Sequence, residues 1–222
     1  MSGAPVSTPA PALRSSGDDV ETRERLLESA ARLFSERGFA AVTVRDICAA
    51  AHANVAAVNY HFAGKLGLYQ AVMRMAIARM QDATAEGQRA GEGLNAEGRL
   101  RAYVQVFVTR VVAGQQGWIH QLMMRELSDP TPALDLVVAE VLRPRLAYLA
   151  AVVAELIGCD EDDPRVMRAT FSVHAQCVGL MGHPIARRVN PVLTSGPDAL
   201  EAMVDHITEF SLAGLWALAR RG

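Results

Sequence analysis

The sequence predicts an all-α protein, and two properties of its 222 residues support this fold class. Half of the residues are apolar but only 5% are aromatic, because Ala, Leu, Val and Met supply most of the hydrophobicity, and Ala, Leu and Met favour helices. The chain has no run of alternating β-branched residues bounded by turn residues, which is the usual pattern of a strand. We therefore expect about nine helices in one large or two small domains.

The N-terminal segment predicts an arm followed by an amphipathic helix. Residues 1–19 are rich in Pro, Ala, Ser and Gly, offer little to bury, and are expected to be disordered. A first helix is expected to begin near Glu21 and to stop at Gly38, a residue suited to left-handed backbone. Apolar residues recur along it at helical spacing, at Leu26, Ala30, Leu33 and Phe34.

Residues 43–62 predict a helix-turn-helix. Thr43, with Asp46 three residues later, has the pattern of a capping box, so a short helix should follow Thr43. A turn around His52 follows, and Asn54 can cap the next helix. The second helix of such a motif can lie in the major groove of DNA, which predicts double-stranded DNA as a partner.

Caps, glycines and prolines mark the rest of the chain. Glycines at positions 87–98 indicate a loose join, so we place one domain at residues 20–80 and a second at 81–222. Pro144 should kink or split the long helix that contains it. The helices expected after the motif span about 64–80, a segment capped by Asn95, 118–128, 131–156, 164–182 and 197–218.

Charge is distributed unevenly along the chain. Residues 21–80 carry eight Lys or Arg against five Asp or Glu, whereas residues 81–222 carry thirteen against seventeen. The whole chain has a formal net charge of −2, which argues against a general nucleic-acid binder. A basic N-terminal domain joined to an acidic C-terminal domain suits a protein that meets phosphates with one end only.

The sequence gives no sign of secretion or membrane insertion. Cys48, Cys159 and Cys177 are odd in number and lack CxxC spacing, which favours a reducing compartment. The N-terminus has no basic region followed by an apolar core, and no apolar run approaches membrane-spanning length. We therefore expect a cytoplasmic protein with no membrane partner.

Several motifs occur in order between residues 21 and 80: Thr22-Arg23, Ala30-Ala31-Arg32-Leu33-Phe34, Gly38-Phe39, Thr43-Val44-Arg45-Asp46-Ile47, Tyr60-His61-Phe62, and Lys65 with Leu68 and Tyr69. Together they resemble the DNA-binding domain of TetR/AcrR-type transcriptional regulators. The segments Met123-Met124-Arg125-Glu126, Pro130 to Leu134 and Arg143-Pro144 are similar to the CerR/CecR-type C-terminal domain. The resemblance implies a homodimer whose C-terminal helical domain binds a small-molecule effector and releases a repressor from a palindromic operator.

One position departs from the family pattern. The turn of the motif usually has Gly where this chain has His52. A residue there often needs a positive φ, which His tolerates at some cost. We expect a slightly reshaped turn and retained function.

The motif and the resemblance give nine candidate DNA-binding residues. Small side chains on the third helix allow close approach to the groove, and Asn59 can pair with adenine. Arg45 can reach a guanine or a phosphate, and Lys65, the only lysine, can meet a phosphate at the start of the fourth helix. Tyr60 can equally pack against the domain, and His61 can lie on the surface. The full set is Thr43, Arg45, Asn54, Ala56, Ala57, Asn59, Tyr60, His61 and Lys65.

Ten residues of the C-terminal helices are candidates for an effector pocket. Aromatic residues and Met supply adaptable apolar walls, and polar residues on partly apolar helices can orient a ligand. Arg125 and Glu126 have the alternative of pairing with each other or with a neighbouring helix. The candidates are Tyr103, Phe107, Arg110, His120, Met123, Met124, Arg125, Glu126, Phe171 and His174.

The last two long helices are candidates for dimerisation. Val173, Cys177, Leu180 and Met181 share a face of the first, and an apolar stripe runs from Leu200 to Leu218 on the second. Two such helices from each subunit can form a four-helix bundle. The alternative is that both stripes pack within their own subunit.

Other functions receive less support from the sequence. The chain has no catalytic or nucleotide-binding motif, so we expect neither an enzyme nor a cofactor. His174, Cys177 and His183 lack a well-spaced fourth ligand, so we expect no metal site. Two alternatives stay open. One is a small-molecule-binding protein whose N-terminal domain has lost DNA binding through His52, and the other is a redox regulator acting through Cys48 or Cys177.

Overall fold

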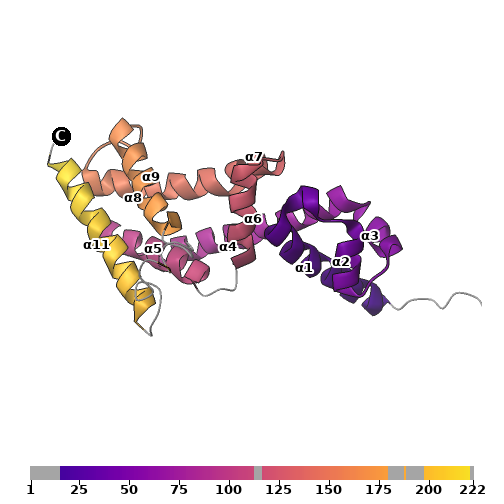
Figure 1. The fold of residues 1–222 in the computed structure, drawn as a ribbon. Helices are drawn as coiled ribbons and strands as arrows, with labels where there is room; N and C mark the ends of the chain where they lie inside the picture. Colours follow the sequence, from indigo (N-terminus) through magenta and orange to yellow (C-terminus); the bar gives the residue numbers. More distant parts are fainter. Residues whose placement is uncertain (1–15, 113–116, 180–187, 189–197, 221–222) are drawn as a thin grey trace, which may run out of the picture. The chain divides into compact units, whose positions relative to one another are not determined.

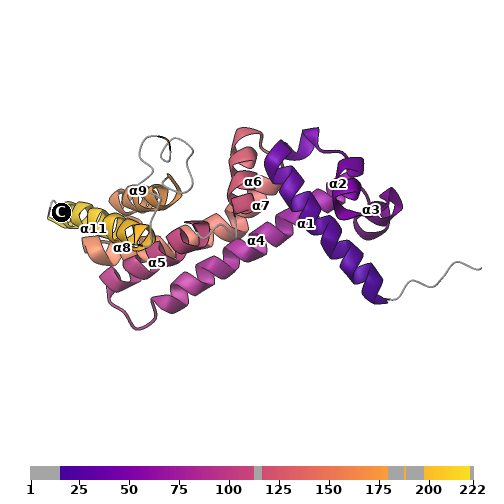
Figure 2. The same cartoon turned by 60° about the horizontal axis from the view of Figure 1, so that its bottom comes forward.

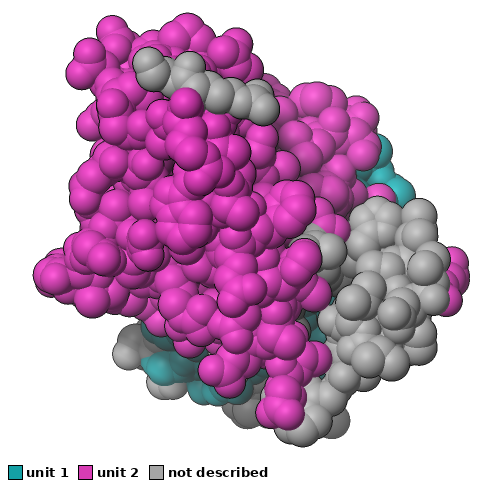
Figure 3. Space-filling view, turned by 90° about the vertical axis from the view of Figure 1, so that its left-hand side faces the viewer, with its two compact units in different colours: residues 1–72 teal, residues 73–222 magenta. Residues whose placement is uncertain are grey.

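The computed structural model describes residues 16–112, 117–179, 188 and 198–220, and these residues form helices and no strand. The all-α prediction is therefore confirmed. The chain divides into two compact units, residues 1–72 and 73–222, which Figure 3 shows in separate colours. The domain boundary that we expect after residue 80 stays a prediction.

The first unit is built from three helices and the beginning of a fourth (Figure 1). Phe34 is fully buried at its centre, and its ring meets the Tyr69 ring edge-on with centroids 5.1 Å apart. Gly38 has φ 81° and interrupts the first helix, as its expected left-handed role requires. The helices are α1 (Ser16–Ala41), α2 (Val44–Ala51), α3 (Val55–Phe62) and α4 (Lys65–Ala90).

The start of α1 differs from the prediction. Residues 16–19 are helical, so the disordered arm predicted for residues 1–19 is wrong for these four positions. Asp18 and Asp19 lie in the first turn, where carboxylates interact favourably with the free N–H groups of a helix start. Residues 1–15 lie outside the described residues.

Two glycines of α4 have different roles. Gly87 lies inside the helix, so the loose join predicted there is wrong; one Gly costs a helix only about 1 kcal/mol. Gly67 is required for close approach, because a Cβ at this position would lie 1.8 Å from the carbonyl oxygen of Phe62. The turn between α3 and α4 therefore depends on the missing side chain.

The second unit has a core formed by four long helices (Figure 2). α11 packs against α5, α8 and α9, and α8 packs against both α5 and α9. Leu100, Leu149 and Ile207 are fully buried in this core. The helices of the unit, besides the end of α4, are α5 (Ala96–Val112), α6 (Gly117–Ser128), α7 (Ala133–Val137), α8 (Arg143–Ile157), α9 (Pro164–Gly179) and α11 (Ala199–Ala219).

Pro144 reshapes the backbone that precedes it, as predicted. The π-helix η1 (Val138–Leu142) separates α7 from α8, and the Arg143 N–H donates to the Val138 carbonyl five residues earlier. Pro144 has no N–H for the Glu140 carbonyl, which would be its partner in a regular helix. The Gln81 side chain supplies the missing donor, with Nε2 3.3 Å from that oxygen.

The stripes predicted to face a second subunit lie largely inside the chain's own core. Val173 and Cys177 on α9, and Ile207 and Leu215 on α11, are each at most 2% exposed. Their burial contradicts the prediction that these residues form an interface, because four α-helices of one subunit already cover them. Leu180 and Met181 lie outside the described residues.

The described helices were predicted to have no membrane-spanning segment. None of these helices is long and apolar enough to cross a bilayer.

Candidate functional site

The turn between α2 and α3 has regular left-handed geometry despite the histidine. His52 has φ 51° and ψ 43°, so the predicted positive φ is confirmed. The Ala53 N–H donates to the Cys48 carbonyl at 2.9 Å, which satisfies the end of α2. The end of α2 is therefore satisfied with His52 in place of Gly, and the slight reshaping of the turn stays a prediction.

Local side chains cap both helices of the motif. The Thr43 hydroxyl and N–H both donate to Asp46 Oδ2, at 2.7 and 2.9 Å, and the Asp46 N–H donates back to Thr43 Oγ1 at 3.2 Å. These hydrogen bonds hold the pKa of the Asp46 carboxyl below its usual value. Asn54 Oδ1 accepts from the Ala57 N–H at 2.8 Å. Both predicted caps are therefore present.

α3 has an inner and an outer face. Val58, Phe62 and Ala57 are at most 7% exposed and pack into the first unit. Ala57 lies on this inner face, so its methyl group is buried, and its assignment as a DNA contact stays a prediction. The outer face carries Val55, Ala56, Asn59 and Tyr60, all exposed, and Tyr60 is 76% exposed.

The remaining candidates of the first unit lie at the start of α2, on α3 and at the start of α4. Thr43 and Arg45 are exposed at the beginning of α2. His61 is half-buried, with its ring between those of Tyr60 and Phe62. Lys65 is held in place: its ammonium lies 4.5 Å from the centre of the Phe39 ring and 3.4 Å from the Ala40 carbonyl oxygen. Its charge is thereby kept near the helix start.

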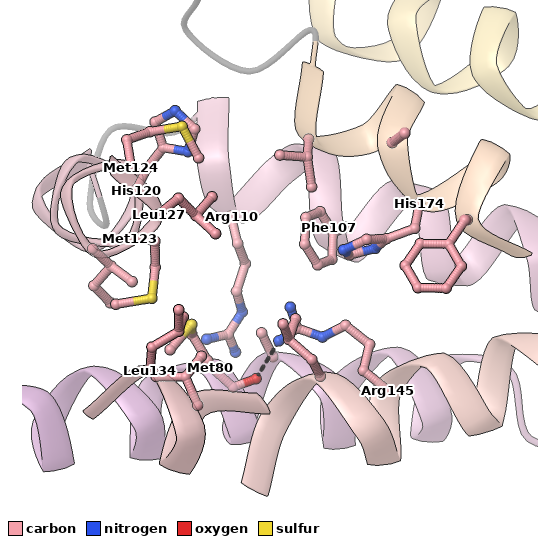
Figure 4. Close-up of a pocket in the computed structure, with 17 residues that line it drawn as sticks. Met80, Phe107, Arg110, His120, Met123, Met124, Leu127, Leu134, Arg145 and His174 are labelled. Atoms are coloured by element: carbon pink, nitrogen blue, oxygen red, sulfur yellow. Dashed lines mark hydrogen bonds between the residues drawn. The ribbon is translucent and has the colours of Figure 1, made fainter. Parts of the chain in front are cut away.

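The second unit contains a cavity of about 320 Å³ (Figure 4). It lies between α4, α5, α6, α7, η1, α8 and α9, and we call it the effector-type cavity. Its walls are mostly apolar, with a few cationic or imidazole groups. The lining residues are Met80, Ala83, Phe107, Arg110, Ile119, His120, Met123, Met124, Leu127, Leu134, Val137, Leu142, Arg145, Phe171, His174, Ala175 and Val178.

Most of the predicted pocket residues meet at this cavity. Phe107, Arg110, His120, Met123, Met124, Phe171 and His174 line it, whereas three candidates do not. Tyr103 is buried behind the wall, and Arg125 is exposed on α6. Glu126 is buried, where its carboxylate accepts from the Thr131 N–H at 3.1 Å and from the Thr131 hydroxyl at 2.9 Å. It stabilises the turn between α6 and α7.

Arg145 is a cavity residue that sequence reasoning missed. Its side chain is only 4% exposed. Nε donates to Thr84 Oγ1 at 2.9 Å, and Nη2 donates to the Met80 carbonyl at 2.8 Å, both on α4. The guanidinium also lies over the Phe107 ring, 4.8 Å from its centre. The position directly after Pro144 gave no signal of burial, since Arg usually marks a solvated helix face.

His174 is held by a buried tyrosine. The Tyr103 hydroxyl and His174 Nδ1 are hydrogen-bonded at 2.9 Å, and the ring of Phe107 meets the imidazole edge-on. Burial, together with the Arg145 charge, lowers the pKa of His174 to about 4. Burial also raises the pKa of Tyr103 far above its ordinary value. Both side chains are therefore neutral at physiological pH, and they orient one another.

Arg110 is the other guanidinium at the cavity, and it is paired. Its Nε donates to Glu86 Oε2 at 2.8 Å, and its Nη2 bonds the same oxygen. The pair is part-buried between α4 and α5. Figure 4 shows the side chains of Arg110 and Arg145 both pointing into the cavity. Glu86 balances only the first of these two charges.

The cysteines do not support the redox alternative. Cys48 is 5% exposed and Cys177 is fully buried. Burial raises the pKa of both thiols, that of Cys177 to about 12, which disfavours the thiolate that oxidation requires. Among the described residues, no three His, Cys, Asp or Glu side chains gather around a possible metal position; His183 lies outside them.

Comparisons with known proteins agree with both units. The family profile described as "Bacterial regulatory proteins, tetR family" matches residues 26–72. The profile described as "HTH-type transcriptional dual regulator CecR, C-terminal domain" matches residues 96–215, more than half of the chain. The HTH-type transcriptional dual regulator CecR of Shigella flexneri is 27% identical over 172 residues, which cover 73% of this chain and 76% of that protein.

Solved structures share the fold at low sequence identity. A protein of Pseudomonas aeruginosa PAO1 assigned as a transcriptional regulator superimposes with a TM-score of 0.68 at 22% identity, covering 95% of this chain and 96% of that chain. The fatty acid degradation regulator FadR of Bacillus halodurans gives a TM-score of 0.64 at 17% identity, with 87% and 96% covered. From these matches, the helix-turn-helix and the CecR-type profile, the chain belongs to the TetR family of DNA-binding transcriptional regulators, with a C-terminal domain of the CecR type.

Proposed function

We propose that the protein is a homodimeric repressor that binds a palindromic operator and is released by a small molecule held in the effector-type cavity. The observation that carries the proposal is this cavity of about 320 Å³, which lies within the CecR-type domain and joins apolar walls to a few oriented polar groups. Its volume is at the lower end of the range of about 300–1,000 Å³ that is usual for small-molecule sites. The proposal includes no catalytic step.

The outer face of α3 is the proposed base-reading surface. Val55 and Ala56 are small enough to approach thymine methyl groups, and Asn59 can form two hydrogen bonds with adenine. Tyr60 projects from the same face and is proposed to contact phosphate. Arg45 and Lys65 supply positive charge at the starts of α2 and α4, where phosphates are favoured.

The proposed dimer face uses the exposed residues of α11, which include Phe210 and Gly214 of the predicted stripe, rather than the buried ones. Phe210 is 65% exposed and Trp216 is 43% exposed, with the small residues Ala213 and Gly214 between them. Large apolar side chains gathered on one helix favour burial against a partner. Two helix-turn-helix units related by two-fold symmetry would then bind the two half-sites of a palindrome.

The effector must discriminate between two states of the dimer. A ligand shifts an equilibrium only by the difference between its affinities for the two states. We propose that the cavity binds its ligand more tightly in the geometry that does not fit the operator. The Shigella flexneri relative is named a dual regulator, so activation at some promoters is the second candidate function.

Genomic selection followed by a release screen tests the proposal. The purified protein is mixed with sheared genomic DNA at low ionic strength, the retained fragments are sequenced, and compounds are screened for release of those fragments. We expect a few palindromic sites and a compound class that dissociates them. Retention of no specific fragment would contradict operator binding, and sites that no compound releases would contradict control by an effector.

Sedimentation tests the dimer with a matched pair of variants. Phe210→Glu should give a monomer at micromolar concentration, because a carboxylate cannot be buried in an apolar interface without a partner. Leu94→Glu changes an exposed leucine, 48% accessible, outside α9 and α11 and should leave a dimer. A dimer in both variants would rule out the outer face of α11 as the interface.

A further inference from the structure

We propose that the effector is an apolar monocarboxylic acid whose carboxylate binds the free edge of the Arg145 guanidinium. This inference rests on the proposed function, because it assigns a ligand class to the same cavity. Three observations support it: the charge balance of the cavity, the unused hydrogen-bond donors of Arg145, and the distribution of apolar wall residues.

The charge balance leaves one positive charge without a partner. No Asp or Glu is among the seventeen described residues that line the cavity. The charge of Arg110 is balanced by Glu86 from the adjoining turn of α4. No ion pair among the described residues includes Arg145. A cation buried without a counter-ion is costly, and an anionic ligand group is a direct way to remove that cost.

The hydrogen bonds of Arg145 leave one edge of its guanidinium open. Nε and Nη2 are directed at Thr84 and at the Met80 carbonyl, which fixes the plane of the group. The two Nη1 protons have no acceptor among the described residues. An arginine has five donors in a planar fork that matches the two oxygens of a carboxylate. A bound carboxylate would use the donors that the protein leaves free.

The neighbouring imidazole can add a further donor. His174 lines the cavity and is hydrogen-bonded to Tyr103 through Nδ1. In the tautomer where the Tyr103 hydroxyl donates, His174 Nε2 carries the ring proton and can donate to a ligand oxygen. Because burial and the Arg145 charge lower the pKa of His174, it adds a hydrogen bond and no second positive charge. One anionic group per ligand is therefore sufficient.

The rest of the cavity fits an apolar body. Met80, Met123 and Met124 present flexible thioethers, and Leu127, Leu134 and Phe171 complete the wall. A second charge on the ligand would meet this wall without a counter-ion. The structure therefore favours a compact acid with one carboxylate and an aromatic or aliphatic remainder over a dianion such as a phosphate monoester.

Calorimetry with acid and amide pairs tests the ligand class on the full-length protein without DNA. The probes are 4-phenylbutyrate, octanoate and 2-naphthoate, each compared with its primary amide, which has nearly the same shape and no charge. We expect the acids to bind at least about tenfold more tightly than the amides, as charge-assisted bonds are markedly stronger than neutral ones. Equal affinities within each pair, or no binding of any acid at millimolar concentration, would overturn the proposal.

Substitutions at Arg145 test whether this residue binds the carboxylate of the ligand. Arg145→Gln should reduce acid affinity at least about tenfold and leave amide affinity within about threefold, since the ionic contact serves the acid and not the amide. Arg145→Lys should keep part of the acid preference. Arg125→Gln is the matched control, because Arg125 is exposed on the same unit and does not line the cavity. Should Arg145→Gln misfold by circular dichroism, the acid and amide comparison in the unchanged protein still decides.

The same measurements separate this inference from the proposed function. Acids that bind through Arg145 but leave the operator complex intact would refute effector control and support the ligand class. Neutral compounds that release the operator equally well from the Arg145→Gln variant would refute the ligand class and support effector control.

Discussion

The helix-turn-helix of the first unit and the effector-type cavity of the second unit depend on hydrogen bonds of very different sequence separation. The caps of α2 and α3 join residues three positions apart, as in Thr43 with Asp46 and Asn54 with Ala57. The cavity depends on hydrogen bonds over 61 to 71 positions, as in Arg145 with Thr84 and Tyr103 with His174. The comparison teaches that a short DNA-reading motif can be specified locally, whereas a ligand cavity exists only when distant helices have packed.

The largest effect is expected at Gly67, a position of the first unit where the backbone leaves no room for a side chain. Gly67→Ala would place a Cβ 1.8 Å from the Phe62 carbonyl oxygen, a backbone atom that cannot move without displacing the end of α3. We expect a loss of about 3 kcal/mol or more, with loss of DNA binding. Urea unfolding and DNA-binding anisotropy measure both effects.

Gly87→Ala is the matched control on the same helix. A Cβ there would lie 3.9 Å from the nearest side-chain atom, in ordinary contact, so Ala should stabilise α4 by up to about 1 kcal/mol. Equal free energies of unfolding and equal DNA binding of the two variants would show that the close approach of the backbone at Gly67 does not determine the structure of the first unit.

The next effect concerns pH and the second unit. The unfolded chain protonates His174 near its ordinary pKa of 6.5, whereas the folded protein resists protonation until about pH 4. Folding stability should therefore fall as pH decreases through this window, by up to about 3 kcal/mol. His174→Gln should remove this part of the pH dependence, as measured by unfolding of both proteins between pH 7 and pH 4. An NMR titration of His174 with a midpoint above pH 6 would contradict the expectation.

The third effect concerns Asn59, on the exposed face of α3 in the first unit. Asn59→Ala should weaken operator binding by about 1–3 kcal/mol and relax the preference at one base pair, because an adenine contact is lost. Stability should change little, since the Asn59 side chain is exposed. Binding curves on operators with single base changes test this. Uniform weakening on all operators would indicate a phosphate contact instead.

The smallest effect is expected at Lys65. Lys65→Ala should weaken binding to all DNA sequences alike, by less than about tenfold, and should reduce the slope of log affinity against log salt by about 1. A change in sequence preference with an unchanged slope would contradict the phosphate assignment. Lys65→Arg keeps the charge and the position over Phe39, so it should preserve the slope.

The sequence predicted the caps and the turn of the helix-turn-helix correctly. The Thr43 capping box, the Asn54 cap and the positive φ of His52 all follow from neighbouring residues, and all are present. The burial of Ala57 was not foreseen, because a sequence shows that the side chains of a helix face are small without showing which side is covered. Its 6% exposure depends on how α3 packs within the first unit, where it contacts both α1 and α2.

The positions of the C-terminal helices were predicted more accurately than the partners against which their faces pack. Pro144 correctly predicted a break, but the π-helix before it, and the Gln81 side chain that satisfies Glu140, depend on packing against α4. The apolar stripe of α11 was read as an interface, although Ile207 and Leu215 lie in the chain's own core. An amphipathic stripe shows that a face is buried and does not say by what.

The sequence by itself determined the fold class, the helix-turn-helix with its caps, and the family, because these depend on residues within a few positions of one another and on ordered motifs. Only the tertiary structure decided that Arg145 is a buried cation beside His174, while Arg125 and Glu126 lie away from the cavity. The physical reason is that the free energy of a buried charge depends on neighbours from other helices, and their identity is fixed only when those helices pack.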